Sequence, residues 1–571
     1  MSRLLLLILL LVVSACAPAE PDQPNILWLT VEDLSARLPM YGDATVATPA
    51  LSRLAEEGVV FEHLYATYPV CSPNRSSIIT GQYPNAIGTM HMRTGGDPSF
   101  KGGIPTYEAV PPPHVKAFPE LLRAAGYYAS NNVKTDYQFG EPFTIWDETS
   151  TTATWQNRAE GQPFFSVFNF TGTHESRAWP QETSIDLVKW LTGSERPDTL
   201  DQRYADLMAA EAPPLQTDPA SVPVPPYYPD TPTTREHIAR YYDNIVKMDA
   251  WVGAHLDSLE AAGLLDETIV VFFSDHGDGL PRGKRWLYDS GLHMPMIVRW
   301  PDGRGAGTRR SDLVSVIDLA PTMLSLASAA RPERLPGRVF LGDSTEAAPR
   351  YVFGGRDRMD EAFDRSRFAR SERFKYIRND FPEIPYSEPS VYRDLPPIWR
   401  DFKAAADAGT LTGPPAAFFA PAKPAEELYD TAADSHEVRN LAGDPAFADT
   451  LAAMRNAVTD WLLLVGDRAE QDERAMIETM WPDGEQPQTP PPVVTFMEDD
   501  AGAQVVKVMA PMRGSSIGYR HVDGDYDSGW QVYTAPLPIA TGRIHAKAIR
   551  YGYQESRETV TYLSADGLDA P

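Results

Sequence analysis

Cysteine is scarce in this chain, and so are long hydrophobic runs. Only two cysteines, Cys16 and Cys71, occur among its 571 residues. The apolar run Leu4–Val13 has about ten residues, whereas a helix that spans a membrane needs about twenty. A chain of this length can bury a sizeable core without disulfides, and it should form more than one domain.

Basic side chains are also few. The chain has 51 Lys and Arg residues against 78 Asp and Glu residues, so its formal net charge is −27. A protein this acidic should not bind nucleic acid through its overall field. If its substrate is an anion, binding requires a local cluster of cations or a metal ion that works against the global charge.

The N-terminus is typical of an export signal. Ser2-Arg3 precedes the apolar run, and small residues follow it up to Cys16. Val13-Ser14-Ala15-Cys16 resembles a bacterial lipobox, which implies a signal peptide at 1–15, lipid on Cys16 and a short tether at 16–23. An ordinary signal peptide cut nearby is the alternative. Either way we expect an exported protein, and the lipobox implies a lipoprotein anchored to a membrane in the periplasm or at the cell surface.

The first four hundred residues alternate between strand and helix patterns. This alternation predicts an α/β sheet that is covered by helices on both faces. The predicted strands are 25–30, 59–61, 127–129 and 268–273, and the predicted helices are 51–57, 118–125 and 236–262. Two proline-rich stretches, 212–234 and 382–424, either border a substrate cleft or are plain surface loops.

Cys71 opens the run Cys71-Ser72-Pro73-Asn74-Arg75, which continues to Thr80-Gly81. An isolated cysteine is most simply a small buried hydrophobe. This run, however, resembles the type I sulfatase signature, Cys-x-Pro-x-Arg followed by Thr-Gly. The resemblance implies that a maturation enzyme converts Cys71 to formylglycine, whose hydrate attacks sulfur, and that Arg75 holds the oxygens of this nucleophile.

The resemblance also implies a fold and its boundaries. An alkaline-phosphatase-like mixed sheet would occupy residues 24–480, with the catalytic α/β part ending near 335. A smaller antiparallel sheet would complete this sulfatase domain up to about 480. Pro73 favours the first turn of a helix that starts near Cys71, so a bound sulfate would lie at a helix N-terminus.

Acidic pairs follow two of the predicted strands. Glu32-Asp33 follows 25–30 and Asp275-His276 follows 268–273, at the strand ends where an open α/β sheet places its site. Helix capping is the alternative role for such pairs. The sulfatase resemblance implies that Glu32, Asp33, Asp275 and His276, with converted Cys71, bind a divalent cation, usually Ca²⁺, with Mg²⁺ possible. Glu32 departs from the family, which usually has aspartate there.

Three further residues match family positions. Lys284 matches a lysine that contacts a sulfate oxygen, His174 a histidine placed as general acid, and Lys134 a lysine of the Gly-Lys-Trp-His stretch. Asp136 stands where this stretch usually has a catalytic histidine. As isolated residues, such lysines are most often solvated surface groups. His91, Arg93, Trp286 and His293 lie near these motifs and form either a sugar subsite or parts of the core and surface.

A linker at 481–492 and a β-rich region at 493–571 complete the chain. Short strand patterns between turns predict a small all-β sandwich, which resembles the C-terminal domain of hexosaminidases and some bacterial sulfatases. It carries no evident catalytic set, so a packing role is favoured over sugar binding.

The interpretation is a sulfatase that hydrolyses a sulfate ester on a carbohydrate. Two alternatives remain open. One is a phosphonate or phosphate ester hydrolase of the same superfamily. The other is a cell-surface glycan-binding protein whose Cys71 is never converted and whose β-sandwich does the binding.

Overall fold

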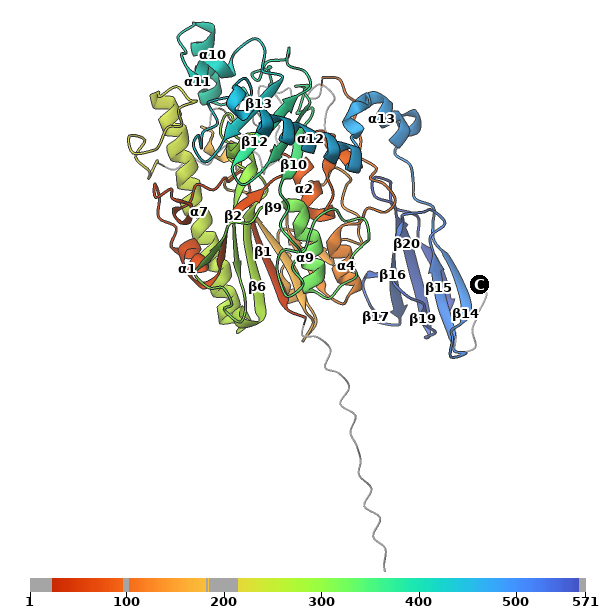
Figure 1. The fold of residues 1–571 in the computed structure, drawn as a ribbon. Coiled ribbons are helices and arrows are strands. Elements are labelled where there is room, and N and C mark those ends of the chain that lie inside the picture. Colours follow the sequence, from red (N-terminus) through yellow and green to blue (C-terminus); the bar gives the residue numbers. More distant parts are fainter. Residues whose placement is uncertain (1–22, 96–101, 181–182, 184–213, 564–571) are drawn as a thin grey trace, which may run out of the picture.

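A computed structural model describes residues 23–95, 102–180, 183 and 214–563 (Figure 1). The predicted signal peptide, Cys16 and all but the last residue of the predicted tether therefore lie outside the described residues. Within the described part of the chain, no helix combines the length and the apolarity that crossing a membrane requires.

A nine-stranded mixed sheet forms the centre of the catalytic part. Its strand order is β4-β3-β5-β1-β6-β7-β2-β8, and β9 pairs with β2. β1 lies between β5 and β6 and is parallel to both, and every residue of β1 is buried. The strands are β1 (Asn25–Val31), β2 (Val59–Tyr65), β3 (Tyr128–Asn132), β4 (Glu148–Thr149), β5 (Phe164–Phe170), β6 (Thr268–Ser274), β7 (His293–Arg299), β8 (Thr308–Arg310) and β9 (Val314–Ser315).

Helices cover both faces of this sheet, as predicted (Figure 1). α1 (Pro49–Glu57) packs with α7 (Pro232–Ala261) on one face, while α2 (Cys71–Thr80), α4 (Phe118–Ala124) and α9 (Leu319–Leu326) lie together on the other. α7 begins four residues before its predicted start because Pro232 occupies its first turn and Thr231 caps it by accepting a hydrogen bond from Thr234 N. The mixed α/β class is therefore confirmed.

A second, antiparallel sheet follows the catalytic part. It has the order β10-β11-β12-β13, with β10 (Val352–Arg356), β11 (Ser366–Arg370), β12 (Phe374–Asn379) and β13 (Glu426–Asp430). α12 (Ala448–Val465) covers it through a separate hydrophobic cluster that includes Leu428, Val458 and Trp461. The other α-helices among the described residues are α3 (Pro84–Ile87), α8 (Asp289–Leu292), α10 (Pro397–Asp407), α11 (Pro414–Phe418) and α13 (Glu473–Met480).

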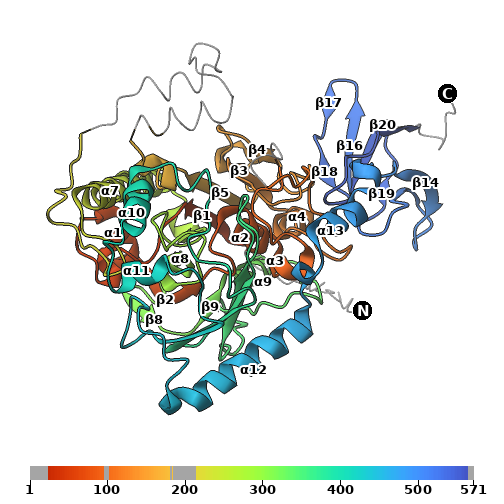
Figure 2. The same ribbon diagram turned by 90° about the horizontal axis from the view of Figure 1, so that it is seen from above.

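The C-terminal region forms two small antiparallel sheets beside the catalytic part (Figure 2). They enclose a core of their own that includes Val506, Ile544 and Leu563. Buried residues alternate with partly exposed ones from Ile544 to Ala548 of β20, which explains why this strand could be predicted from sequence. Its strands are β14 (Val493–Glu498), β15 (Gln504–Met509), β16 (Ser516–Asp523), β17 (Tyr526–Asp527), β18 (Gln531–Val532), β19 (Leu537–Pro538), β20 (Gly542–Ile549) and β21 (Thr559–Leu563).

Candidate active site

Cys71 is the first residue of α2, and its side chain is buried with 2% exposed. Asn74 holds this end of the helix in place. Its Oδ1 accepts hydrogen bonds from the backbone N–H groups of Thr67 and Tyr68, and its Nδ2 donates to the Asp275 carbonyl. Sequence reasoning did not single out Asn74, although it occupies a variable position inside the Cys71 run. It joins the helix that carries Cys71 to the end of β6.

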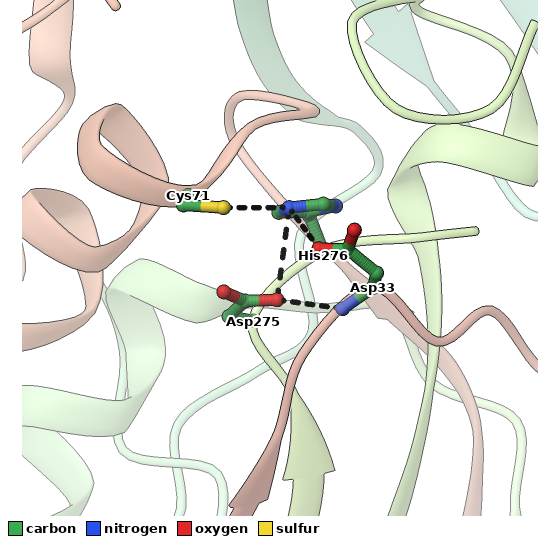
Figure 3. A group of neighbouring side chains, drawn as sticks. All are labelled: Asp33, Cys71, Asp275 and His276. Carbon is green, nitrogen blue, oxygen red and sulfur yellow. Dashed lines mark hydrogen bonds and ion pairs between the residues drawn. The ribbon is translucent and has the colours of Figure 1, made fainter. Parts of the chain in front are cut away.

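Glu32-Asp33 and Asp275-His276 lie side by side because they follow two neighbouring parallel strands. Val31 and Ser274 are paired at the ends of β1 and β6, so the residues that follow them emerge side by side. Asp33 N–H donates to Asp275 Oδ1 over 3.1 Å, and Asp33 adopts a left-handed backbone with φ of 50°. The ligand atoms of Asp33, Cys71, Asp275 and His276 all lie within 4.8 Å of one another (Figure 3).

His276 occupies the centre of this group. Its Nε2 lies 3.3 Å from Cys71 Sγ, 3.1 Å from Asp33 Oδ1 and 3.7 Å from Asp275 Oδ1. Its Nδ1 lies 2.9 Å from the carbonyl oxygen of Gly277, which can accept a hydrogen bond from it. Burial lowers the pKa of His276, but Asp275 and Asp33 outweigh burial and raise it to about 10. Metal-binding histidines commonly donate one ring N–H to a carbonyl and direct the other nitrogen at the metal. His276 has this arrangement, with Nδ1 at the Gly277 carbonyl and Nε2 facing the carboxylates.

Three cations surround the acidic pairs. Lys284 Nζ lies 2.9 and 3.0 Å from the two carboxylate oxygens of Asp33. Lys134 Nζ lies 2.7 Å from Glu32 Oε1. Arg75 Nε donates to Asp275 Oδ2 over 3.0 Å. The local positive cluster that an anionic substrate requires is therefore present inside a protein of net charge −27.

These cations change the acidity of their neighbours. Burial raises the pKa of the Cys71 thiol, but Lys134 and Lys284 lower it to about 6. Burial also raises the pKa of Asp33, and Lys284 and His174 lower it to well below its ordinary value. Residue 71 and the Asp33 carboxylate are thus placed where negative charge is stabilised.

His174 lies just beyond the end of β5. One of its ring nitrogens, Glu32 and Asp33 offer ligand atoms within 4.8 Å of one another, which forms a second group beside the first. Its Nδ1 lies 2.9 Å from Ser176 Oγ and accepts a hydrogen bond from Ser176 N–H over 3.4 Å. An accepting Nδ1 leaves the proton of the neutral ring on Nε2.

Glu175 is a site residue that sequence reasoning missed. Its carboxylate receives two hydrogen bonds from Arg285, at 2.8 and 2.9 Å, and lies 3.3 Å from Lys284 Nζ. Its backbone N–H donates to Asp33 Oδ2 over 2.7 Å. Burial raises the pKa of Glu175, but Arg285 and Lys284 lower it to about 2. The sequence signal that could have indicated Glu175 was its position directly after His174. Its partner Arg285 likewise directly follows Lys284.

Asp136 also lies at this site. Ser72 Oγ donates to its carboxylate, and Lys134 Nζ lies 3.8 Å from it. An aspartate at this position therefore interacts with the residue that follows Cys71. A carboxylate accepts hydrogen bonds here, whereas the histidine expected from the sequence resemblance could donate one.

The four residues considered for a sugar subsite have different surroundings. Trp286 is only 2% exposed and packs against Trp399 and Phe418 in the hydrophobic core, so it presents no ring face to a ligand. His91 is buried near Glu473, Arg93 pairs with Asp360, and the ring of His293 lies beside Tyr65.

Comparison with known proteins settles the family. The Sulfatase family profile matches residues 24–145 and 130–329, which is more than half of the chain. An "Ulvan-active sulfatase" of Formosa agariphila is 39% identical over 547 residues, which cover 94% of this chain and 91% of that relative. The chain belongs to the sulfatase family. As a sulfatase it is a sulfuric ester hydrolase.

More distant proteins agree with this sulfatase in sequence and in fold. Human "N-sulphoglucosamine sulphohydrolase" is 27% identical over 493 residues, covering 79% of this chain and 92% of the relative. One solved structure, determined in complex with its substrate D-glucosamine-2-N,6-O-disulfate, has a TM-score of 0.55 at 18% identity. It covers 79% of this chain and 100% of its own. The sulfatase fold predicted from the Cys71 run is thereby confirmed.

Proposed function

We propose that this sulfatase hydrolyses a sulfate ester on a carbohydrate, with residue 71 in its formylglycine form and with a divalent cation, Ca²⁺. The observation that carries the proposal is the position of Cys71. Its Sγ lies at the first turn of α2, among Asp33, Asp275 and His276. A helix N-terminus favours a sulfate group, and the acidic side chains beside it favour a cation, so the two can be held together.

The nucleophile would come from residue 71. As its hydrate, formylglycine supplies one hydroxyl to attack sulfur and a second whose deprotonation allows sulfate to be released. Lys134 and Lys284, which already lower the pKa of the Cys71 thiol, would stabilise negative charge on this side chain in the same way. Arg75 donates to Asp275 in the same region, and it would bind sulfate oxygens once a cation neutralises that carboxylate.

The donor set fits a divalent cation. Asp33, Asp275 and Glu32 offer carboxylate oxygens and His276 offers Nε2, with the oxygen of converted residue 71 as a further donor. Glu32 Oε1 is buried and accepts no hydrogen bond, although Lys134 Nζ lies 2.7 Å away. Oxygen-rich ligation favours Ca²⁺ or Mg²⁺. A bound cation would supply positive charge to the sulfate oxygens and to the nucleophile.

His174 would donate the proton to the leaving alcohol. Ser176 N–H engages its Nδ1, so the neutral ring carries its proton on Nε2. To act as a general acid, the ring would carry a second proton on Nδ1, which can be donated to Ser176 Oγ 2.9 Å away, and loss of the Nε2 proton to the leaving alcohol would then leave neutral imidazole. Lys284, which lies between Asp33 and Glu175, would contact a sulfate oxygen beside the leaving group.

A panel of esters tests this proposal. We expect protein produced with a formylglycine-generating enzyme to desulfate at least one sulfated oligosaccharide, because the described site gathers cations for a sulfate group. The panel should include ulvan, for which the 39% identical relative is named, together with aryl sulfate and aryl phosphonate esters. Release of inorganic sulfate is measured by ion chromatography. Faster hydrolysis of the phosphonate than of every sulfate would instead support the phosphonate hydrolase alternative.

We also propose that lipid on Cys16 anchors the protein to a membrane. The support is the sequence Val13-Ser14-Ala15-Cys16 alone. Expression of the full chain in a bacterium that processes lipoproteins should place it in the membrane fraction, and Cys16→Ala should release it. Fractionation followed by immunoblotting measures this. Equal membrane association of both forms, or a soluble parent protein, would contradict the anchor.

A further inference from the structure

Tyr551 belongs to the β-sandwich in sequence but not in packing. It follows the end of β20 by two residues, and its side chain is 0% exposed. Its ring packs into the main hydrophobic core of the catalytic part rather than into the cluster around Val506 and Ile544. The sandwich therefore inserts one aromatic side chain into the neighbouring domain.

The hydroxyl of Tyr551 is held on the catalytic side. It donates to Glu120 Oε2 over 2.9 Å and accepts from Ala117 N–H over 3.2 Å. Glu120 is buried in α4 and also receives hydrogen bonds from Ser516 Oγ, at 2.6 Å, and from Thr144. One buried carboxylate thus bonds to side chains of both domains, which fixes their relative position.

The ring of Tyr551 leads towards the active site. It stacks on Phe139 with centroids 5.2 Å apart and an interplanar angle of 11°, and Phe139 stacks on Tyr137 at 5.8 Å. Tyr137 lines a cavity of about 30 Å³ together with Arg75 and Lys134. A row of three aromatic rings therefore connects the β-sandwich to the segment that carries Lys134.

A backbone contact runs beside this row. Gly552 has a φ of 83°, and a Cβ atom there would lie 2.2 Å from the carbonyl oxygen of Ala109. Ala109 N–H in turn donates to the carbonyl of Gln138 over 2.7 Å. Asp136 and Gln138 both adopt left-handed backbone conformations, with φ of 59° and 69°. Non-glycine residues persist in this conformation only where their surroundings hold them.

We propose that Tyr551 is a positioning residue for the segment Lys134–Phe139, and that the β-sandwich is thereby an integral part of the catalytic unit. This inference rests on the role proposed for Lys134. The Tyr551 ring supports Phe139 and Tyr137, which keep Lys134 beside Glu32 and Asp136 beside Ser72. The sandwich acts through this support and does not need to touch the substrate.

Replacement of Tyr551 tests the proposal. Tyr551→Ala is expected to lower kcat by about tenfold to a hundredfold with less than a threefold change in KM, because Lys134 would lose its orientation. Tyr551→Phe keeps the ring and should retain kcat within about threefold. Hydrogen exchange followed by mass spectrometry should show faster exchange at 134–139 in Tyr551→Ala only.

The matched control is Ile544→Ala, which damages the core of the sandwich itself. It should reduce stability while kcat and exchange at 134–139 stay unchanged. Unchanged kcat and exchange in folded Tyr551→Ala would overturn the proposal, as would equal effects of Ile544→Ala. The exchange measurement needs no turnover, so it separates failure of this inference from failure of the proposed sulfatase chemistry.

Discussion

Replacement of Cys71 by alanine is expected to lower kcat/KM on a sulfate ester by about 10⁴-fold or more. Alanine at this position can be neither converted nor used as a nucleophile. Arg75, Lys134 and Lys284 would still surround a bound sulfate. Binding should therefore survive while turnover is lost. The measurement is steady-state kinetics on an aryl sulfate, with substrate binding followed by calorimetry.

The control for this variant is the other cysteine. Cys16→Ala replaces the other cysteine of the chain and should leave kcat/KM unchanged, because Cys16 belongs to none of the motifs that carry the proposed chemistry. Mass spectrometry of the intact peptide that spans residue 71 shows whether sulfur has been lost. Cys71→Ala that retains more than about one hundredth of the parent activity would contradict the assignment of the nucleophile. So would full activity of a parent protein whose Cys71 is entirely unmodified.

Removal of divalent cations is expected to lower kcat by about 10³-fold, and Ca²⁺ should restore it. The reason lies in the charges of the site. Asp33 and Asp275 lie within 4.8 Å of His276 and Cys71, and all four residues are buried. Without a cation, Lys284 neutralises Asp33 and Arg75 neutralises Asp275, so these groups are not free to bind sulfate. A bound cation would neutralise the two carboxylates, which would leave Lys284 and Arg75 free to bind the sulfate of the substrate.

Stability gives a measure of metal binding that does not depend on turnover. A cation that binds only the folded chain should raise its stability by about 2.7 kcal/mol at a concentration of one hundred times Kd. Calorimetry of the metal-free protein with added Ca²⁺ measures this. Asp275→Asn should abolish the increase, whereas the matched variant Asp249→Asn should keep it, because the Asp249 carboxylate caps α1 through Ala50 and Leu51 N–H. A stability that Ca²⁺ leaves unchanged, together with full activity after chelation, would exclude the metal site.

Much of the site could be predicted because its residues directly follow elements with clear sequence patterns. Two buried apolar strands end immediately before Glu32-Asp33 and Asp275-His276, and parallel strands bring such ends together. The Cys71 run predicted the start of α2 in the same way, since Pro73 favours a first helical turn. Helix ends shifted by a few residues where capping decided the boundary, as at Thr231 and α7.

Other residues could not be predicted because only packing decides their role. Trp286 lies two residues after Lys284, and the sequence left open whether its ring binds a sugar; contact with Trp399 places it in the core. Glu175 has no motif of its own and becomes part of the site through Arg285, which is 110 residues away. Such ion pairs depend on side-chain geometry that no local pattern encodes.

The sequence by itself determined the sulfatase family, the α/β sheet and the place of Cys71 at a helix N-terminus, because these follow from local patterns of apolar residues and from one short run. The tertiary structure alone decided which cation neutralises which carboxylate, and that Tyr551 stacks on a residue more than four hundred positions earlier. The physical reason is that burial turns these contacts into strong constraints, and burial is a property of the folded chain as a whole.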